Sequence, residues 1–151
     1  RCDVYTTDAS GLAATKAAFD NPNDHVVLPE VISKEPLGPV VRHGDDQWAD
    51  IASWTLKVMM VAEELGITSQ NAAKMKNSEN PEIRRLLGVD ELQGVSALGL
   101  SPDWAYNIIT QVGNYGESFE RHLGKSTKLG LSRGINALAK DGGLHYIPPV
   151  K

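Results

Sequence analysis

The sequence has little of three things that would quickly assign a function. It holds a single cysteine, Cys2, which excludes an internal disulfide framework and a metal site built from several cysteines. The central apolar run, residues 58–62, is far shorter than the roughly 20 residues that a membrane-spanning helix needs. Lys and Arg number 15 against 19 Asp and Glu, so the net charge is -4. We therefore expect that the chain binds no nucleic acid. We also expect that it is not a polybasic protein of a membrane surface.

The chain also begins without a methionine or the apolar core of a signal peptide. We therefore expect it to be a fragment or a processed product. Its 151 residues are enough for about one domain. With 41% hydrophobic and 23% charged residues, the composition is close to that of a globular protein.

Motifs that carry catalysis or bind cofactors are missing as well. No two histidines have the spacing of a helical metal pair, and none lies in a Cys/His cluster. The four are His25, His43, His122 and His145. The Gly-Lys-Ser at 124–126 is similar to the end of a phosphate-binding loop, but Phe119 occupies the position of its first glycine and no strand precedes it. We therefore predict no cofactor, no metal and no enzymatic activity.

The coarse pattern divides into strand signals first and helices afterwards. Residues 2–7, 25–28 and 38–42 favour strands, with prolines that place them at edges or crossovers. A helix is expected over 9–19, and a long one from 44–46 to Gly66, with apolar residues at i, i+3, i+4 and i+7. This apolar face comprises Trp48, Ile51, Ala52, Thr55, Val58, Met59, Ala62 and Leu65, widened by Trp54 and Val61.

Beyond residue 68 the pattern is helical with interruptions. Asn80 and Ser101 each precede a proline at an expected first helical position. The helix after Ser101 is predicted to continue past Gly113. A last helix is predicted through residues 131–138, closed by glycines 142–143, followed by an extended tail at 145–149.

Asp8 is the candidate ligand-binding residue that the pattern alone selects. It follows a predicted strand and precedes a predicted helix, and ligands in open α/β sheets bind at the carboxyl ends of strands. A carboxylate there can hold an ammonium group. Asp is also a favoured helix N-cap, and on the pattern alone that structural role is the stronger explanation of the residue.

Several long segments together resemble the general L-amino-acid-binding periplasmic subunits of ABC importers, solute-binding protein family 3. They are RCDVYTTD at 1–8, LPEVISKEPLGPVVR at 28–42, GDDQW at 44–48, NPEIRRLLG at 80–88, QVGNYGE at 111–117, RGINAL at 133–138, GGL at 142–144 and the prolines 148–149. The resemblance extends over the whole chain.

The resemblance implies an α/β, periplasmic binding protein type II-like fold with two lobes joined by crossover strands. This chain would be its helix-rich C-terminal fragment, with few strands and somewhat under half of the usual length. Residues 1–30 would be the last strand and helix of the second lobe. Residues 31–44 would form the hinge crossover and closing strand, and 45–151 the C-terminal helical part of the first lobe.

The resemblance also implies site residues and partners. Asp8 would receive the α-ammonium of an L-amino acid, and Thr6 and Thr7 would border the same cleft. Cys2 would bridge to a cysteine outside this chain. The partners would be the ligand, the membrane permease of the importer and the missing N-terminal part of the protein, and the location would be the periplasm.

Two other functions stay open at this point. Dehydratases are built on the same two-lobe scaffold, but they need a general acid or base in the cleft, and this half offers only Asp8. Alternatively the chain is a stand-alone helical interaction module, as its long helix and acidic charge allow. Such a module would not bind amino acids.

Overall fold

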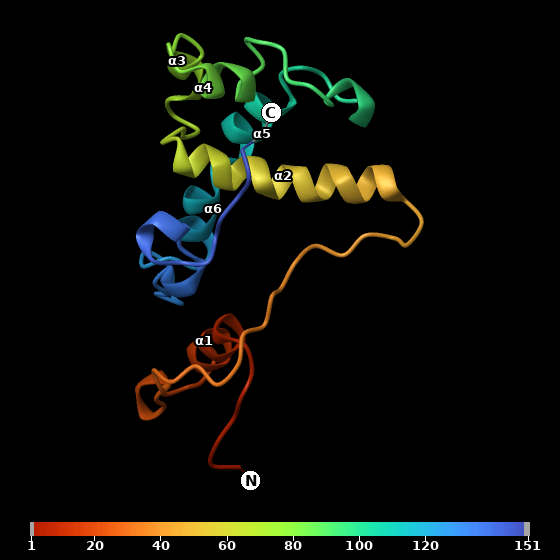
Figure 1. Cartoon of the computed structure of the whole chain (residues 1–151). Helices are drawn as coiled ribbons and strands as arrows, with labels where there is room; N and C mark the ends of the chain where they lie inside the picture. The colour runs from red at the N-terminus through yellow and green to blue at the C-terminus, as the bar shows by residue number, and fades with distance from the viewer. Residues whose placement is uncertain (1, 150–151) are drawn as a thin grey trace. The chain divides into compact units, whose positions relative to one another are not determined.

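The computed structural model describes residues 2–149 of the chain (Figure 1). Arg1, Val150 and Lys151, at the outer limits of the predicted lobe segments, lie outside the described residues. The α-helices are α1 (Ala9–Ala17), α2 (Asp46–Glu64), α3 (Ala72–Met75), α4 (Pro81–Leu86), α5 (Trp104–Val112) and α6 (Tyr115–His122). The short 3-10 helices are η1 (Pro22–Asp24), η2 (Ser96–Leu98), η3 (Gly134–Asn136) and η4 (Ala139–Asp141). Among the described residues, no helix is long and apolar enough to cross a membrane.

The chain divides into two compact units. Unit 1 consists of Arg1–Gly38 and Glu120–Ser132, and unit 2 consists of Pro39–Phe119 and Arg133–Lys151. The two contrast in burial, because all buried hydrophobic residues among those described belong to unit 2. Unit 1 contains α1, none of whose residues is buried.

The core of unit 2 forms around the C-terminal half of α2. Figure 1 shows α3, α4 and α5 gathered there, and α2 packs directly against α5. The residues that share this core are Val58, Val61, Ala62, Ile67, Ala72, Ile83, Leu86, Leu87, Val95, Trp104, Ala105 and Ile109. Fully burying one leucine or isoleucine contributes about 1.5–3 kcal/mol, so this cluster accounts for the compactness of unit 2.

Helix starts agree well with the sequence prediction. Asp8 and Asp45 cap α1 and α2, each accepting a hydrogen bond from a backbone N–H of the first turn. Asn80 caps α4, since its Oδ1 accepts from Glu82 N at 2.9 Å. Ser101 is different, because its Oγ donates to Asp103 Oδ1 and α5 begins only at Trp104. The pattern of short polar residues before a helix therefore located Asp8 and Asn80 as caps and the start of α2 within 44–46, whereas Ser101 is not the cap of α5.

The long helix is where predicted, although its buried face is shorter than expected. Val58, Val61 and Ala62 are buried as the pattern requires. Met60, which the predicted face omits, is also buried, and Trp48 is 55% exposed. The N-terminal turns of α2 thus bury none of their apolar side chains fully, and Trp48 is exposed.

The predicted strands at 2–7, 25–28 and 38–42 are wrong as hydrogen-bonded strands. Within residues 2–149 the structure shows only an isolated bridge between Leu138 and His145. The three segments run extended but pair with no other segment among those described. A β-strand exists only when another strand supplies its hydrogen bonds, so apolar, β-favouring residues alone are not sufficient.

Two helical predictions near the C-terminus also need correction. The helix after Ser101 does not continue past Gly113, because α5 ends at Val112 and α6 begins anew at Tyr115. The last predicted helix is replaced by η3 and η4. The carbonyl of Ile135, which a helix would require, instead accepts from Leu144 N at 2.8 Å. The chain folds back on itself here, and the acceptor that a helix would use is bonded to the returning segment instead.

Candidate functional site

The Asp8 carboxylate is fixed at the start of α1. The backbone of Asp8 is extended (φ -60°, ψ 156°), which is the conformation of a helix N-cap. Its Oδ2 accepts a hydrogen bond from Gly11 N at 3.0 Å and another from Ser10 Oγ at 2.9 Å. The half-buried side chain therefore has one oriented oxygen rather than a freely rotating carboxylate.

The second oxygen of Asp8 remains available as an acceptor. In the part of the chain that the structure describes, both donors reach Oδ2 and none reaches Oδ1. A carboxylate has about four lone-pair positions, so Oδ1 can accept from a cation. Helix capping and cation binding are thus compatible at the same residue, and the ligand role of Asp8 stays a prediction.

Gly11 makes this arrangement sterically possible. A Cβ at position 11 would lie 2.9 Å from Asp8 Oδ1 and 2.9 Å from Thr7 Cγ2. Both side chains therefore lie over the same small residue in the first turn of α1. The structure brings Thr7 and Asp8 together in this way, and both Thr6 and Thr7 are exposed.

Cys2 stands apart from this cluster. It is exposed, and its thiol is free. No hydrogen bond within residues 2–149 joins Cys2 or Thr6 to Asp8. The same residues also contain no group of three or more His, Cys, Asp or Glu side chains that could hold a metal ion.

Sequence reasoning missed a second polar cluster, which lies in unit 2. Arg133 donates to both carboxylate oxygens of Glu63, at 2.8 and 3.1 Å, and to the Asn136 carbonyl. The guanidinium also lies over the ring of Tyr115, 5.1 Å from its centroid. The rings of Tyr115 and His145 meet edge to face, with centroids 4.7 Å apart. Positions 63, 115, 133 and 145 share no sequence period, so only the fold brings them together.

Burial shifts the titration of two members of this cluster. It lowers the pKa of His145 and raises the pKa of Tyr115. The positive charge of Arg133 lowers the His145 pKa further, whereas Glu63 opposes the change. His145 Nδ1 is buried and has no hydrogen-bond partner among the described residues. The cluster joins α2, α6 and the C-terminal tail.

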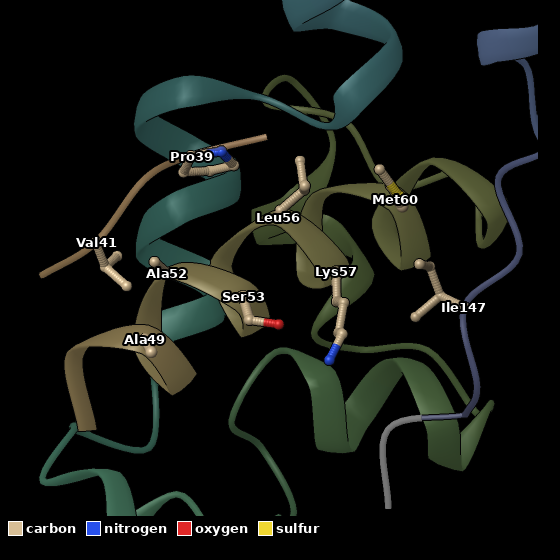
Figure 2. Close-up of a pocket in the computed structure, with 9 residues that line it drawn as sticks. All are labelled: Pro39, Val41, Ala49, Ala52, Ser53, Leu56, Lys57, Met60 and Ile147. Carbon is tan, nitrogen blue, oxygen red and sulfur yellow. The ribbon is translucent and has the colours of Figure 1, made fainter. Parts of the chain in front are cut away.

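A shallow apolar groove of about 350 Å³ lies beside α2 in unit 2 (Figure 2). Six of its residues belong to one side of α2, two to the extended segment before that helix and one to the C-terminal tail. They are Pro39, Val41, Ala49, Ala52, Ser53, Leu56, Lys57, Met60 and Ile147. Among them only Lys57 carries a charge, and its Nζ lies 4.4 Å from the Trp54 ring centroid.

Comparison with known proteins identifies relatives over the whole chain. The chain is 55% identical to a general L-amino acid-binding periplasmic protein of Rhizobium johnstonii, covering 100% of this chain and 45% of that protein. It is 54% identical to a glutamate/glutamine/aspartate/asparagine-binding protein of Rhodobacter capsulatus, covering 99% of this chain and 44% of the relative. No protein-family model matches the chain.

A solved structure shows the same relationship. A periplasmic binding protein of an ABC transporter from Brucella ovis, with glutathione bound, is 51% identical and matches with a TM-score of 0.93. The match covers 99% of this chain and 47% of that one. This chain is homologous to the amino-acid-binding periplasmic proteins of ABC transporters. It spans about half the length of the relatives that it matches.

The homology confirms two predictions made from the sequence. The relatives are amino-acid-binding periplasmic proteins, as the resemblance implies, and the fold is a helix-rich part of a periplasmic binding protein. The relatives are named binding proteins, and the comparisons give no support to the dehydratase alternative. The lobe boundaries and the roles of Cys2, Thr6, Thr7 and Asp8 stay predictions.

Proposed function

We propose that this chain is part of the periplasmic substrate-binding subunit of an amino-acid ABC importer. The observation that carries the proposal is the 51–55% identity to amino-acid-binding periplasmic proteins along essentially the whole chain. The subunit captures its ligand between two lobes and delivers it to the membrane permease. No covalent step is needed for this task, so the protein acts as a carrier and not as an enzyme.

In this proposal, Asp8 holds the α-ammonium of the ligand through Oδ1. A zwitterion that leaves water needs a fixed partner at each charged end. The hydrogen bonds from Ser10 and Gly11 hold Oδ2, which orients Oδ1 without using it. Thr6 and Thr7 border the ligand at the same end of α1. The remaining N-terminal part of the protein supplies the partners of the α-carboxylate, so closure of the lobes depends on the ligand.

The ligand class is set by the α-amino-acid end and not by one side chain. One relative is named for four different amino acids, and the Brucella ovis neighbour has glutathione bound. Glutathione also carries a free α-ammonium and α-carboxylate on its γ-glutamyl residue. Both L-amino acids and γ-glutamyl peptides therefore present the group that Asp8 is proposed to bind.

Calorimetric titration of the intact protein with several L-amino acids and with glutathione tests this role. Asp8→Asn retains the size of the side chain and an acceptor for the helix cap, so the free energy of unfolding should change little. Loss of a charge-assisted hydrogen bond of about 1.5–3 kcal/mol should lower the affinity for every ligand by roughly 10-fold or more. The matched control is Asp20→Asn, which removes the same charge from an exposed residue of unit 1.

The pattern of loss across ligands decides the interpretation. A uniform loss for Asp8→Asn, with Asp20→Asn unchanged, supports contact with the shared ammonium. Unchanged affinities would reduce Asp8 to a helix cap. A loss restricted to basic amino acids would make it a determinant of side-chain specificity.

For Cys2 we propose a disulfide to a cysteine outside this chain. The thiol is free and exposed here, so it is sterically open to a partner. The oxidising periplasm favours such a bond. Mass mapping of the intact oxidised protein without reduction should show Cys2 in a cross-linked peptide, and an alkylatable Cys2 in that sample would reject the proposal.

A further inference from the structure

The C-terminal tail, residues 144–149, lies against unit 2 through alternate side chains. His145 and Ile147 are half-buried, whereas Leu144 and Tyr146 are 59% and 71% exposed. Such alternation is typical of an extended segment with one face on a surface. Ile147 packs against the hydrophobic core, and Figure 2 shows its side chain directed toward α2. Two inward side chains therefore hold the tail, and one of them, His145, can take up a proton.

Backbone hydrogen bonds hold only the beginning of this tail. His145 N donates to the Ala137 carbonyl at 3.1 Å, and the His145 carbonyl accepts from Ala139 N at 2.8 Å. Within the part of the chain that the structure describes, residues 146–149 have no backbone hydrogen bond to another segment. Docking of the tail therefore depends strongly on the surroundings of His145.

Three elements bring aromatic and charged groups to the His145 imidazole. The Tyr115 ring of α6 meets it edge to face, with centroids 4.7 Å apart. Arg133, immediately before η3, lies over the same Tyr115 ring at 5.1 Å from its centroid. On α2, Glu63 accepts from Arg133 with both carboxylate oxygens, at 2.8 and 3.1 Å. The only carboxylate of this cluster is therefore already paired with a cation.

A proton on the imidazole would add a charge that these groups do not compensate. His145 Nδ1 is buried and has no hydrogen-bond partner among the described residues. An imidazolium donates from both nitrogens, and a buried donor without an acceptor costs more when it is charged. Burial and the charge of Arg133 accordingly lower the pKa of His145, and Glu63 opposes them. On η4, Lys140 and Asp141 pair with each other at 3.0 Å.

We propose that residues 144–149 form a pH-sensitive strap on α2, docked while His145 is neutral and released when its imidazole takes up a proton. In the released strap, water solvates both N–H groups of the imidazolium. Release also withdraws Ile147 from α2 and opens the two hollows that this side chain lines. The fully buried residues of the hydrophobic core all lie outside the strap, so release is local and leaves unit 2 folded.

Hydrogen exchange in the intact full-length protein, at about pH 7.5 and about pH 5, tests the strap. Protection factors, which correct for the pH dependence of intrinsic exchange, are compared for the amides of Ala139 and His145 and for residues 58–62. A histidine that stays neutral when docked and has a pKa of about 6.5 when released shifts docking by up to about 30-fold at about pH 5. We expect protection at 139 and 145 to fall by about 3-fold to about 30-fold, with 58–62 unchanged.

Two substitutions remove the proton site. Neither His145→Gln nor His145→Phe can titrate, so protection at residues 139 and 145 should become independent of pH in both. His145→Phe also retains a ring against Tyr115, which guards against loss of docking in His145→Gln. The matched control is His43→Gln, at an exposed histidine of the same unit, and it should respond to pH as the wild type does.

Equal protection of the wild-type strap at the two pH values would overturn the proposal. A pH response that persists in both His145 variants would overturn it as well, because another group would then control the strap. So would an equal loss of protection at residues 58–62, since acid would then open the whole unit and not the strap alone.

Discussion

At the scale of single residues, the position of the Asp8 carboxylate depends on the missing side chain of Gly11. A glycine in a helix is usually replaced by alanine with a gain of up to about 1 kcal/mol. Here the added Cβ would lie 2.9 Å from Asp8 Oδ1, the oxygen proposed to accept the ligand ammonium. The ordinary gain in helix stability is therefore opposed by displacement of the carboxylate.

We predict that Gly11→Ala lowers ligand affinity in the intact protein by roughly 10-fold, the loss expected for one charge-assisted hydrogen bond. Ala14→Gly is the control, because it weakens the same helix at an exposed position and leaves Asp8 untouched. Titration calorimetry measures both variants. If Ala14→Gly loses as much affinity as Gly11→Ala, helix stability rather than carboxylate position sets binding.

His145 gives unit 2 a pH dependence whose sign is fixed by its lowered pKa. The folded state disfavours the protonated imidazole, because burial and the charge of Arg133 outweigh the opposing effect of Glu63. Unfolded histidine titrates near its ordinary value of about 6.5, so the unfolded state binds more protons just below that pH. The stabilising contribution is complete above about pH 6.5 and declines as the pH falls toward the lowered pKa.

The free energy of unfolding should therefore fall between about pH 8 and about pH 5, and His145→Gln should flatten this slope. Denaturant titration at each pH measures it. His43→Gln, at an exposed residue, is the control and should leave the slope as it is. The same slope in wild type and His145→Gln would show that other groups determine the pH dependence.

At the scale of elements, two glycines at helix ends share a backbone conformation but differ in the space around them. Gly66 follows α2 and Gly88 follows α4, and their φ angles, +69° and +70°, both lie in the left-handed region. A Cβ at Gly66 would meet nothing within 4 Å, whereas at Gly88 it would overlap the backbone carbonyl of Pro102. The two sites share their conformational demand and differ in their surroundings.

Gly66→Ala should cost about 1 kcal/mol of unfolding free energy, the typical penalty for a left-handed alanine. Gly88→Ala should cost more, because the backbone around Pro102 must also move. Chemical denaturation of the two variants under the same conditions compares them. Equal losses would mean that the crowding around Gly88 is relieved at no cost.

Elements also show which parts of the fold can be predicted from sequence. Asp8 and Asn80 are predictable as caps because a cap is a local interaction within three residues, and Asp45 lies in the predicted helix start at 44–46. The extended segment 38–42 was interpreted as a strand because its residues favour one, yet strand pairing depends on a distant partner. The Glu63–Arg133 pair spans 70 positions and left no periodic signal that could reveal it. Asp8 itself was found from its position between two elements, but its free oxygen required the atomic arrangement.

At the scale of the whole molecule, the two units should differ strongly in stability. α1 is nine residues long and none of them is buried, and isolated helices shorter than about 12–15 residues are marginal in water. The core of unit 2, in contrast, fully buries Val58, Ile67, Leu87 and Ile109. Local opening should therefore be frequent in α1 and rare in the buried half of α2.

Hydrogen exchange measured by mass spectrometry on this chain should detect the difference. Amides in α1 should exchange nearly as fast as in an unfolded peptide, and those at 58–62 should be protected. The internal control is α4, which has only six residues but buries Ile83 and Leu86. Because α4 is shorter than α1, its protection would show that burial and not helix length decides stability. Slow exchange throughout α1 would contradict the prediction, since a helix without buried residues would then be as stable as the core.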